Sequence, residues 1–307
     1  MPLAVGPAMS ATGGFPEDVM FIATLIAKDR LARGDISAAE DVLGTRGFAW
    51  IDEDRAGDFV FSGDPGAARR GLEGLIEDVD VIVQPQANRR KRLLLADMDS
   101  TMIGQECIDE LADFAGFRAE VAEVTERAMR GELDFEAALD ARVALLAGLD
   151  AAAIDRCREE RVRLTKGARA LVRTMRANGA YALLVSGGFT RFALPVADSI
   201  GFDAARANEL EIEAGALTGR VARPIVGAEA KRAALLETAA ARGIAIAETL
   251  AVGDGANDIP MLEAAGLGVA YHAKPKAAAA ADARIEVNDL TALLYAQGYA
   301  RAEWVED

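Results

Sequence analysis

Histidine is almost absent from this sequence of 307 residues, which contains only His272. A His-rich zinc site is therefore excluded, and a Ser–His–Asp or Cys–His mechanism could use only this one residue. Cysteine is nearly as scarce: Cys107 and Cys157 have neither a CxxC spacing nor a neighbouring histidine. We expect two unpaired thiols in a reducing cytoplasm rather than a disulfide. Chemistry in this chain is expected to use carboxylates, lysine and a hard metal ion.

Basic residues are outnumbered, with 34 Lys and Arg against 49 Asp and Glu, so the net charge is −15. Such an acidic chain should not bind nucleic acid through a general basic surface. No apolar run is long enough to cross a membrane. Residues 1–17 lack the basic residues and the apolar core of a secretory signal and are expected to be a mobile leader.

Residues 18–85 are expected to form a ferredoxin-like α+β module, because their elements follow the order βαββαβ. Strand patterns and helical patterns alternate along this region, over residues 19–27, 37–43, 48–52, 58–63, 65–79 and 80–85. Residues 86–92 are polar and basic and form the predicted linker. Their basic run, Arg89–Arg92, is expected to be a solvated hinge rather than a nucleic-acid patch.

The stretch LLLADMDSTMIG, residues 93–104, combines a buried strand with two acidic residues. Its three leucines suit a strand that is covered on both faces of a parallel sheet. Asp97 and Asp99 follow directly, and carboxylates at the end of a buried strand must be solvated, hydrogen-bonded or paired with a cation. A simple helix N-cap is the alternative interpretation.

Residues 105–165 show four helical patterns and no strong strand pattern. An insertion of this length exceeds a single crossover helix, so we expect a helical cap over the end of the first strand. The alternative is a plain helical layer of the core.

Residues 166–307 return to alternating strands and helices, which predicts a mainly parallel, doubly wound sheet together with residues 93–104. A β-hairpin is expected over residues 209–221, with Gly215 and Gly219 in its turn region. Two further strands end in polar residues, and if they neighbour the first strand, their ends share one pocket. These strand ends contribute Ser186, Gly187, Asp254, Asn257 and Asp258.

The residue types in this pocket suit a metal and a phosphate. Asp97 and Asp254 could hold Mg²⁺ through oxygen ligands. Ser186 and the N–H groups after it could bind a phosphate at a helix N-terminus, and Lys231 could direct its ammonium to the same place.

Four motifs resemble the haloacid dehalogenase (HAD) superfamily of aspartate-nucleophile phosphatases. They are DMDST at 97–101, SGG at 186–188, Lys231 and GDGAND at 253–258. Over residues 90–295 the chain is similar to the phosphoserine phosphatase family within it. The resemblance implies a Rossmann-like α/β core with an inserted cap. The N-terminal module resembles an ACT-type regulatory domain.

The resemblance also implies site residues and a reaction. Asp97 would attack phosphorus, and Asp99 would act as acid and then as base. Mg²⁺ would be bound by Asp97, Asp254 and the carbonyl of Asp99. The phosphoryl group would be held by Ser186, Gly187, Lys231 and Asn257. Asp258 would orient Lys231 or a metal-bound water, or else be an ordinary acid in a first helical turn.

The family's cap residues also have counterparts here. Glu106 and Arg142 would hold the amino acid, and Met129 and Phe135 would form the apolar wall. Arg142 could instead be a solvated helix charge. The expected activity is Mg²⁺-dependent hydrolysis of phosphoserine in the cytoplasm, the last step of serine biosynthesis.

The sequence also limits partners and leaves other functions open. The expected partner is the small substrate, with no nucleic acid and no membrane. A homodimer and an amino-acid effector at the N-terminal module are possible. Alternative functions are a phospho-accepting signalling domain, a phosphotransferase and a ligand-binding protein without catalysis. Asp99 and the long cap argue against the signalling domain.

Overall fold

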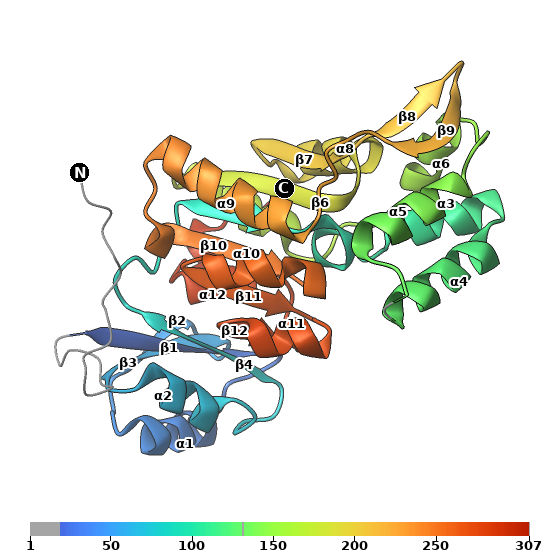
Figure 1. Cartoon of the computed structure of the whole chain (residues 1–307). Helices are drawn as coiled ribbons and strands as arrows, with labels where there is room; N and C mark the ends of the chain where they lie inside the picture. Colours follow the sequence, from blue (N-terminus) through green and yellow to red (C-terminus); the bar gives the residue numbers. More distant parts are fainter. Residues whose placement is uncertain (1–18, 131, 307) are drawn as a thin grey trace, which may run out of the picture.

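A computed structural model describes residues 19–130 and 132–306 of the chain. The expected leader, residues 1–17, lies outside this part. Two large sheets organise the described residues, a four-stranded antiparallel sheet and a six-stranded parallel sheet (Figure 1). None of the helices in the described residues is both long enough and apolar enough to span a bilayer.

The N-terminal region has the predicted βαββαβ order, with antiparallel strands in the spatial order β2-β3-β1-β4. Both helices cover one face of this sheet (Figure 1), and Leu25 and Phe59 pack on that side. The α+β fold predicted here is confirmed. Its elements are β1 (Met20–Ala27), α1 (Arg33–Leu43), β2 (Phe48–Asp52), β3 (Ala56–Ser62), α2 (Pro65–Leu72) and β4 (Val79–Pro85).

Both helices of this region differ from the predicted lengths at one end. Helix α1 begins at Arg33, one turn before the predicted start, because Asp35 accepts a hydrogen bond of 2.8 Å from the Ala32 N–H and caps the first turn. Helix α2 ends at Leu72 rather than at residue 79. Gly74 follows with a φ of 74°, a left-handed conformation that terminates helices.

The six-stranded sheet is parallel and has the order β12-β11-β10-β5-β6-β7, which confirms the predicted α/β core. Its strands are β5 (Leu93–Ala96), β6 (Tyr181–Phe189), β7 (Ala204–Asn208), β10 (Thr249–Gly253), β11 (Leu267–Tyr271) and β12 (Ala283–Ile285). The accompanying helices are α7 (Ala168–Ala177), α8 (Thr190–Ile200), α9 (Ala228–Arg242), α10 (Ile259–Ala264), α11 (Pro275–Ala280) and α12 (Ala292–Ala296). Short helical turns are η1 (Met98–Met102), η2 (Ile246–Glu248), η3 (Ala256–Asp258) and η4 (Arg301–Glu303).

Strand β5 lies in the middle of this sheet and is completely buried. Alternate side chains of a strand point to opposite faces. Leu93 and Leu95 therefore pack with the residues of α9 and α10, whereas Leu94 and Ala96 pack with those of α7 and α12. Burial on both faces explains the uninterrupted apolar run.

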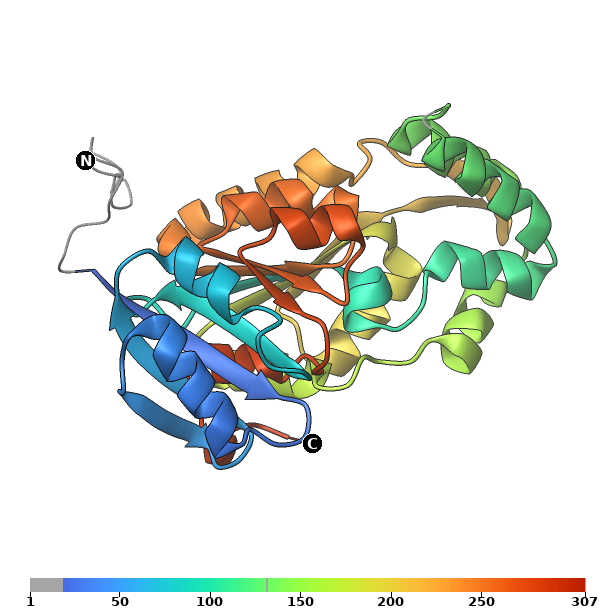
Figure 2. The same ribbon diagram turned by 90° about the horizontal axis from the view of Figure 1, so that it is seen from below.

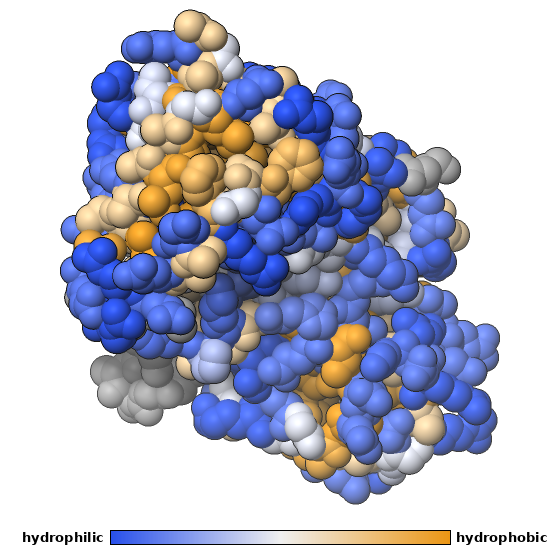
Figure 3. Space-filling model, turned by 90° about the vertical axis from the view of Figure 1, so that its right-hand side faces the viewer, coloured by the Kyte–Doolittle hydropathy of each residue, from blue (hydrophilic) through white to orange (hydrophobic). Residues whose placement is uncertain are grey.

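Four helices lie between β5 and α7, and they stand away from the sheet (Figure 1). They are α3 (Cys107–Ala115), α4 (Arg118–Met129), α5 (Phe135–Ala144) and α6 (Ala152–Arg161). Seen from below, they and the N-terminal sheet lie at opposite ends of the molecule (Figure 2). Figure 3 views the face at the four-helix end, where apolar residues gather in the upper part among hydrophilic ones.

The hairpin of β8 (Leu210–Glu213) and β9 (Ala216–Val221) packs against this group of helices, with β9 beside α5. The Gly148 N–H donates to the Leu217 carbonyl at 2.8 Å, and the Leu217 N–H donates to the Leu149 carbonyl at 2.8 Å. Gly215 lies in the turn as predicted, but Gly219 lies inside β9. A Cβ at Gly219 would be 2.9 Å from the Cβ of Ala147, so a glycine here allows the hairpin to approach the helices.

The predicted solvated hinge is wrong for two of its four residues. The side chain of Arg89 is only 17% exposed, and Lys91 is buried, with its ammonium 2.9 Å from the Ala247 carbonyl. Basic residues are usually exposed to solvent, but they can be buried where an acceptor inside the protein binds them. Here the second face of the N-terminal sheet, including Ile26 and Ile82, joins the apolar cluster of the parallel sheet. The two units are thus joined by a packed interface.

Candidate active site

The carboxyl ends of three adjacent strands, β10, β5 and β6, meet at one cavity of about 540 Å³. Parallel strands place their carboxyl ends at the same edge, which is why residues far apart in the sequence converge there. Eight of the predicted site residues line this cavity from the core or from the helices above: Asp97, Asp99, Glu106, Phe135, Arg142, Gly187, Asp254 and Asn257.

Lys231 joins two of the strand-end carboxylates beneath the cavity. Its ammonium lies 2.6 Å from Asp97 Oδ1 and 2.6 Å from Asp258 Oδ1, and the side chain is fully buried on α9. Burial lowers the pKa of Lys231, but the two carboxylates outweigh it and raise the pKa above its usual value. Burial and Asp258 raise the pKa of Asp97, and Lys231 counteracts them. An ionised Asp97 therefore depends on Lys231.

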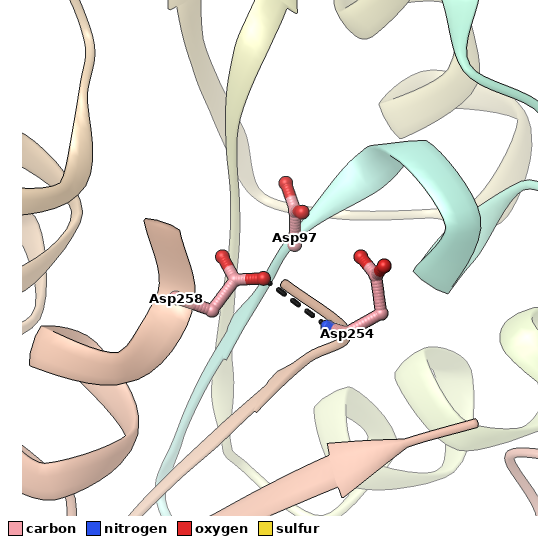
Figure 4. A group of neighbouring side chains, drawn as sticks. All are labelled: Asp97, Asp254 and Asp258. Carbon is pink, nitrogen blue, oxygen red and sulfur yellow. Dashed lines mark hydrogen bonds between the residues drawn. The ribbon is translucent and has the colours of Figure 1, made fainter. Parts of the chain in front are cut away.

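Asp258 uses both of its carboxylate oxygens within the protein. Oδ1 accepts from Lys231, while Oδ2 accepts from the Gly255 N–H at 3.0 Å. Oδ2 also accepts from the Asp254 N–H at 3.1 Å (Figure 4). A Cβ at Gly253 would lie 2.4 Å from Asp258 Cγ, so only glycine leaves room for this carboxylate. Asp258 contacts Lys231, as the sequence suggested, and it also supports the backbone at the end of β10.

Carboxylate oxygens of Asp97, Asp254 and Asp258 lie within 4.8 Å of one another and could hold a metal ion (Figure 4). Asp258 already accepts three hydrogen bonds on its two oxygens, from the Lys231 ammonium and from two backbone N–H groups. Asp97 Oδ2 and the Asp254 carboxylate are therefore the better donors. Burial raises the pKa of Asp254 to about 6, a cost that a bound cation would offset. These hard oxygen donors fit Mg²⁺. The Asp99 carboxylate is not part of this group.

Asp99 is held beside the cavity by two close contacts. Its Oδ1 accepts a hydrogen bond of 3.1 Å from the Cys107 N–H. A Cβ at Gly188 would lie 2.9 Å from its Oδ2, so the glycine allows β6 to approach this oxygen. Burial, followed by the charge of Glu106, raises the pKa of Asp99 to about 7. Asp99 can therefore carry a proton near neutral pH.

Ser186 is fully buried in β6 and is not among the residues that line the cavity. Its Oγ accepts a hydrogen bond of 2.8 Å from the Gly188 N–H. This contact shapes the strand end, whose next two residues, Gly187 and Gly188, do line the cavity. Ser186 is thus placed beneath the cavity rather than at its surface.

The helices above the cavity contribute one anion and one cation. Glu106 precedes α3 and accepts a hydrogen bond of 2.9 Å from Ser100 Oγ. Arg142 on α5 is half-buried, its Nε donates to the Ala138 carbonyl at 3.2 Å, and no carboxylate of the described residues lies within 4.0 Å of it. Burial lowers the pKa of Arg142. Its guanidinium therefore keeps N–H donors available for a ligand in the cavity.

Phe135 closes the cavity from α5. A Cβ at Gly187 would lie 3.2 Å from its ring, which shows that the ring stands directly over the end of β6. The predicted wall residue Met129 ends α4, and its side chain lies outside the described part of the structure.

Lys274 is a charged residue of the cavity that was not predicted from the sequence. It follows β11, the strand beside β10, so its position after a strand end was the available signal. Four apolar lining residues were also missed: Ile108, Leu139, Phe189 and Ala228. Gly188 and Ala256 also line the cavity and lie within the SGG and GDGAND motifs.

Comparison with known proteins agrees with this geometry. Residues 94–263 match a family model described as haloacid dehalogenase-like hydrolase. A phosphoserine phosphatase of Polaromonas is 49% identical over 208 residues, which are 66% of this chain and 88% of that protein. A HAD family hydrolase of Salmonella enterica serovar Typhi has a similar structure, with a TM-score of 0.82 and 28% identity over 90% of this chain and 97% of the other.

A second relative is longer than the matched region. The phosphoserine phosphatase of Streptomyces coelicolor is 50% identical over 226 residues, which are 74% of this chain but only 55% of that protein. The chain thus spans about half of the length of this relative.

Proposed function

The chain belongs to the haloacid dehalogenase-like hydrolase family, and from this premise we propose that it hydrolyses O-phospho-L-serine to L-serine and phosphate. The observation that carries the proposal is a single cavity lined by Asp97 and Asp99 below and by Glu106 and Arg142 above. The lower pair suits phosphoryl transfer, and the upper pair suits a zwitterionic amino acid. The relatives from Polaromonas and Streptomyces carry the name of this activity.

Asp97 is the proposed nucleophile. Its carboxylate oxygen attacks phosphorus, the bond from phosphorus to the serine oxygen breaks, and an aspartyl phosphate forms. Asp99 gives its proton to the departing serine oxygen and then takes a proton from the water that attacks the aspartyl phosphate. The pKa of Asp99, raised to about 7, suits both roles.

The phosphoryl group needs positive charge and N–H donors around it. Lys231, Asn257 and the backbone of Gly187 are the proposed donors, while Ser186 positions the glycines from below. Asp97 and Asp254, with the Asp99 carbonyl, are the proposed ligands of Mg²⁺. When bound, Mg²⁺ would balance charge on the phosphoryl oxygens.

Residues 105–165 are proposed to act as the cap that selects the substrate, over a core of residues 93–104 and 166–307. Arg142 would hold the substrate carboxylate in a bidentate manner, and Glu106 would bind the ammonium. Phe135 would cover the phosphoserine methylene. Together with the phosphate site of the core, Arg142 and Glu106 would match all three charged parts of the substrate.

Further proposals concern the cellular setting. The reaction would be the last step of L-serine biosynthesis, and the two free cysteines, Cys107 and Cys157, suit the cytoplasm. A homodimer and an amino-acid effector at residues 18–85 are predictions from the sequence and its ACT-type resemblance.

A panel of phosphate-release assays tests the proposed function. Phosphoserine, phosphothreonine and phosphoglycolate would be compared with Mg²⁺ present, with and without an added alcohol acceptor. We expect the highest kcat/KM for phosphoserine and stoichiometric release of phosphate. A higher value for phosphoglycolate would contradict the substrate, and transfer of phosphate to the alcohol in preference to water would indicate a phosphotransferase.

A further inference from the structure

Lys274 forms an ion pair with the carboxylate that the proposed metal site needs. Its ammonium lies 3.6 Å from Asp254 Oδ2, and its backbone N–H donates to the Asp254 carbonyl at 2.9 Å. The second contact fixes the backbone between β11 and α11 beside the end of β10. The side chain is thereby anchored at its base, next to the carboxylate it contacts.

Lys274 differs from the other two cations near the cavity. Lys231 is fully buried and contacts two carboxylates, so its ammonium has no freedom to move. Arg142 stands above the cavity on α5. The Lys274 side chain is 69% exposed, while Asp254 is 8% exposed, so the lysine can swing into solvent but the carboxylate cannot.

An ammonium and a divalent cation close to one carboxylate repel each other. Binding a metal at Asp254 must therefore displace the ammonium or work against its charge. Because the lysine is exposed, water and salt screen the repulsion, and the effect is moderate rather than large.

We propose that Lys274 sets the metal affinity of the site by competing with the divalent cation for Asp254. The proposal rests on the metal site of the proposed function and adds a residue that opposes metal binding. A lysine in this position keeps metal binding weak enough to be reversible, and it partly neutralises the buried carboxylate when the ammonium is in contact.

The test is a calorimetric titration of the full-length protein with Mn²⁺ alone, in the absence of substrate. Lys274→Gln removes the charge, and Lys274→Arg retains it. Lys276→Gln is the matched control, because Lys276 is also exposed on α11 but does not line the cavity. Circular dichroism would verify that each variant is folded.

We expect Lys274→Gln to bind Mn²⁺ roughly three- to tenfold more tightly than the unaltered protein at low ionic strength, and Lys274→Arg and Lys276→Gln to stay within about twofold. The difference should shrink at about 1 M salt, where the Debye length falls to about 3 Å. A purely structural role would not produce this salt dependence.

Two results would overturn the inference, and they can be told apart. Equal affinities of Lys274→Gln and Lys276→Gln for Mn²⁺ would refute the competition and leave the proposed function intact. A lack of Mn²⁺ binding by the unaltered protein would refute the competition together with the proposed metal site.

Discussion

Arg89 binds both carboxylate oxygens of Asp58, at 2.6 Å through Nη1 and at 2.7 Å through Nη2. Arg89 belongs to the segment between the two sheets, and Asp58 lies in β3 of the N-terminal sheet. The same guanidinium donates to the carbonyls of Tyr295 at 3.0 Å and Ala296 at 2.8 Å in α12. One arginine thus ties together the linker, the N-terminal sheet and the helical layer of the parallel sheet.

The first prediction concerns the stability of this junction. Arg89→Ala leaves the largely buried Asp58 without its charged partner, with only the Thr24 hydroxyl still donating to it at 2.7 Å. This should lower the free energy of unfolding by about 3–5 kcal/mol. Urea unfolding followed by circular dichroism measures this change. Arg92→Ala is the control, because Arg92 is 54% exposed and its 3.4 Å contact with Glu248 should contribute less than about 1 kcal/mol. Equal losses of unfolding free energy in the two variants would contradict this role of Arg89.

The second prediction concerns the catalytic carboxylates. Asp97→Asn should reduce phosphate release from phosphoserine to the level of a metal-free blank, because the amide cannot act as the nucleophile. Its fold, monitored by circular dichroism, should persist. Steady-state release above the blank would refute the covalent mechanism.

Asp99→Asn should behave differently and depend on the leaving group. Loss of a general acid typically costs about 10²–10⁴-fold, and serine is a poor leaving group that needs this proton. We therefore expect a loss of that size for phosphoserine but a much smaller one for an aryl phosphate, measured as kcat. Equal losses for both substrates would argue against Asp99 as the acid.

The features of the fold and the site that could be predicted from the sequence are those that depend on short-range patterns. The leucine run of β5 and the acidic residues after it follow from alternation and from the cost of burying charge, and the structure agrees. Strand β7, with the sequence AARAN, was missed because it lies at the edge of the sheet and lacks an apolar run. A strand without an apolar run, such as β7, is therefore harder to locate from the sequence than the buried strand β5.

Long-range polar contacts explain why the prediction of a solvated hinge was wrong. Asp80 in β4 accepts hydrogen bonds from the N–H groups of Glu286 at 2.8 Å and Asn288 at 3.0 Å, more than 200 residues away. Nothing near Asp80 in the sequence indicates these partners. The burial of Arg89 and Lys91 depends on similar distant acceptors, so a basic segment was mistaken for a hinge.

The third prediction concerns Lys91 and the pH dependence of stability. Burial lowers the pKa of Lys91 to about 8 in the folded protein, whereas an unfolded lysine titrates near about 10.4. Between these values the unfolded state binds more protons, so the free energy of unfolding rises with pH. From about pH 8 to about pH 9.5 the gain should be roughly 1–2 kcal/mol.

Lys91→Met should abolish this gain, which urea unfolding at several pH values would measure. Lys276→Met is the control, because an exposed lysine should leave the slope unchanged. If the free energy of unfolding rises with pH equally steeply in Lys91→Met and in the unaltered protein, the lowered pKa of Lys91 is not the cause of the rise.

The last prediction concerns substrate choice. Arg142 and Glu106 bring opposite charges to the cavity, and an amino-acid substrate presents a carboxylate and an ammonium to match them. Removing one partner of a desolvated charge pair costs roughly 2–5 kcal/mol, or about 30- to several-thousand-fold in kcat/KM. Arg142→Ala should therefore depress kcat/KM for phosphoserine by that factor and hardly affect a generic aryl phosphate, which has no carboxylate to lose.

Glu106→Gln should show the same preference with a smaller loss, because the neutral amide oxygen can still accept a hydrogen bond from the substrate ammonium. Glu106 also accepts from Ser100 Oγ, so Ser100→Ala is a control for disturbance of this contact alone. Measurement of kcat/KM for both substrates in all three variants separates the possibilities. If Arg142→Ala and Glu106→Gln lose activity equally on the two substrates, these residues support the fold of the cap and the preferred substrate is not phosphoserine.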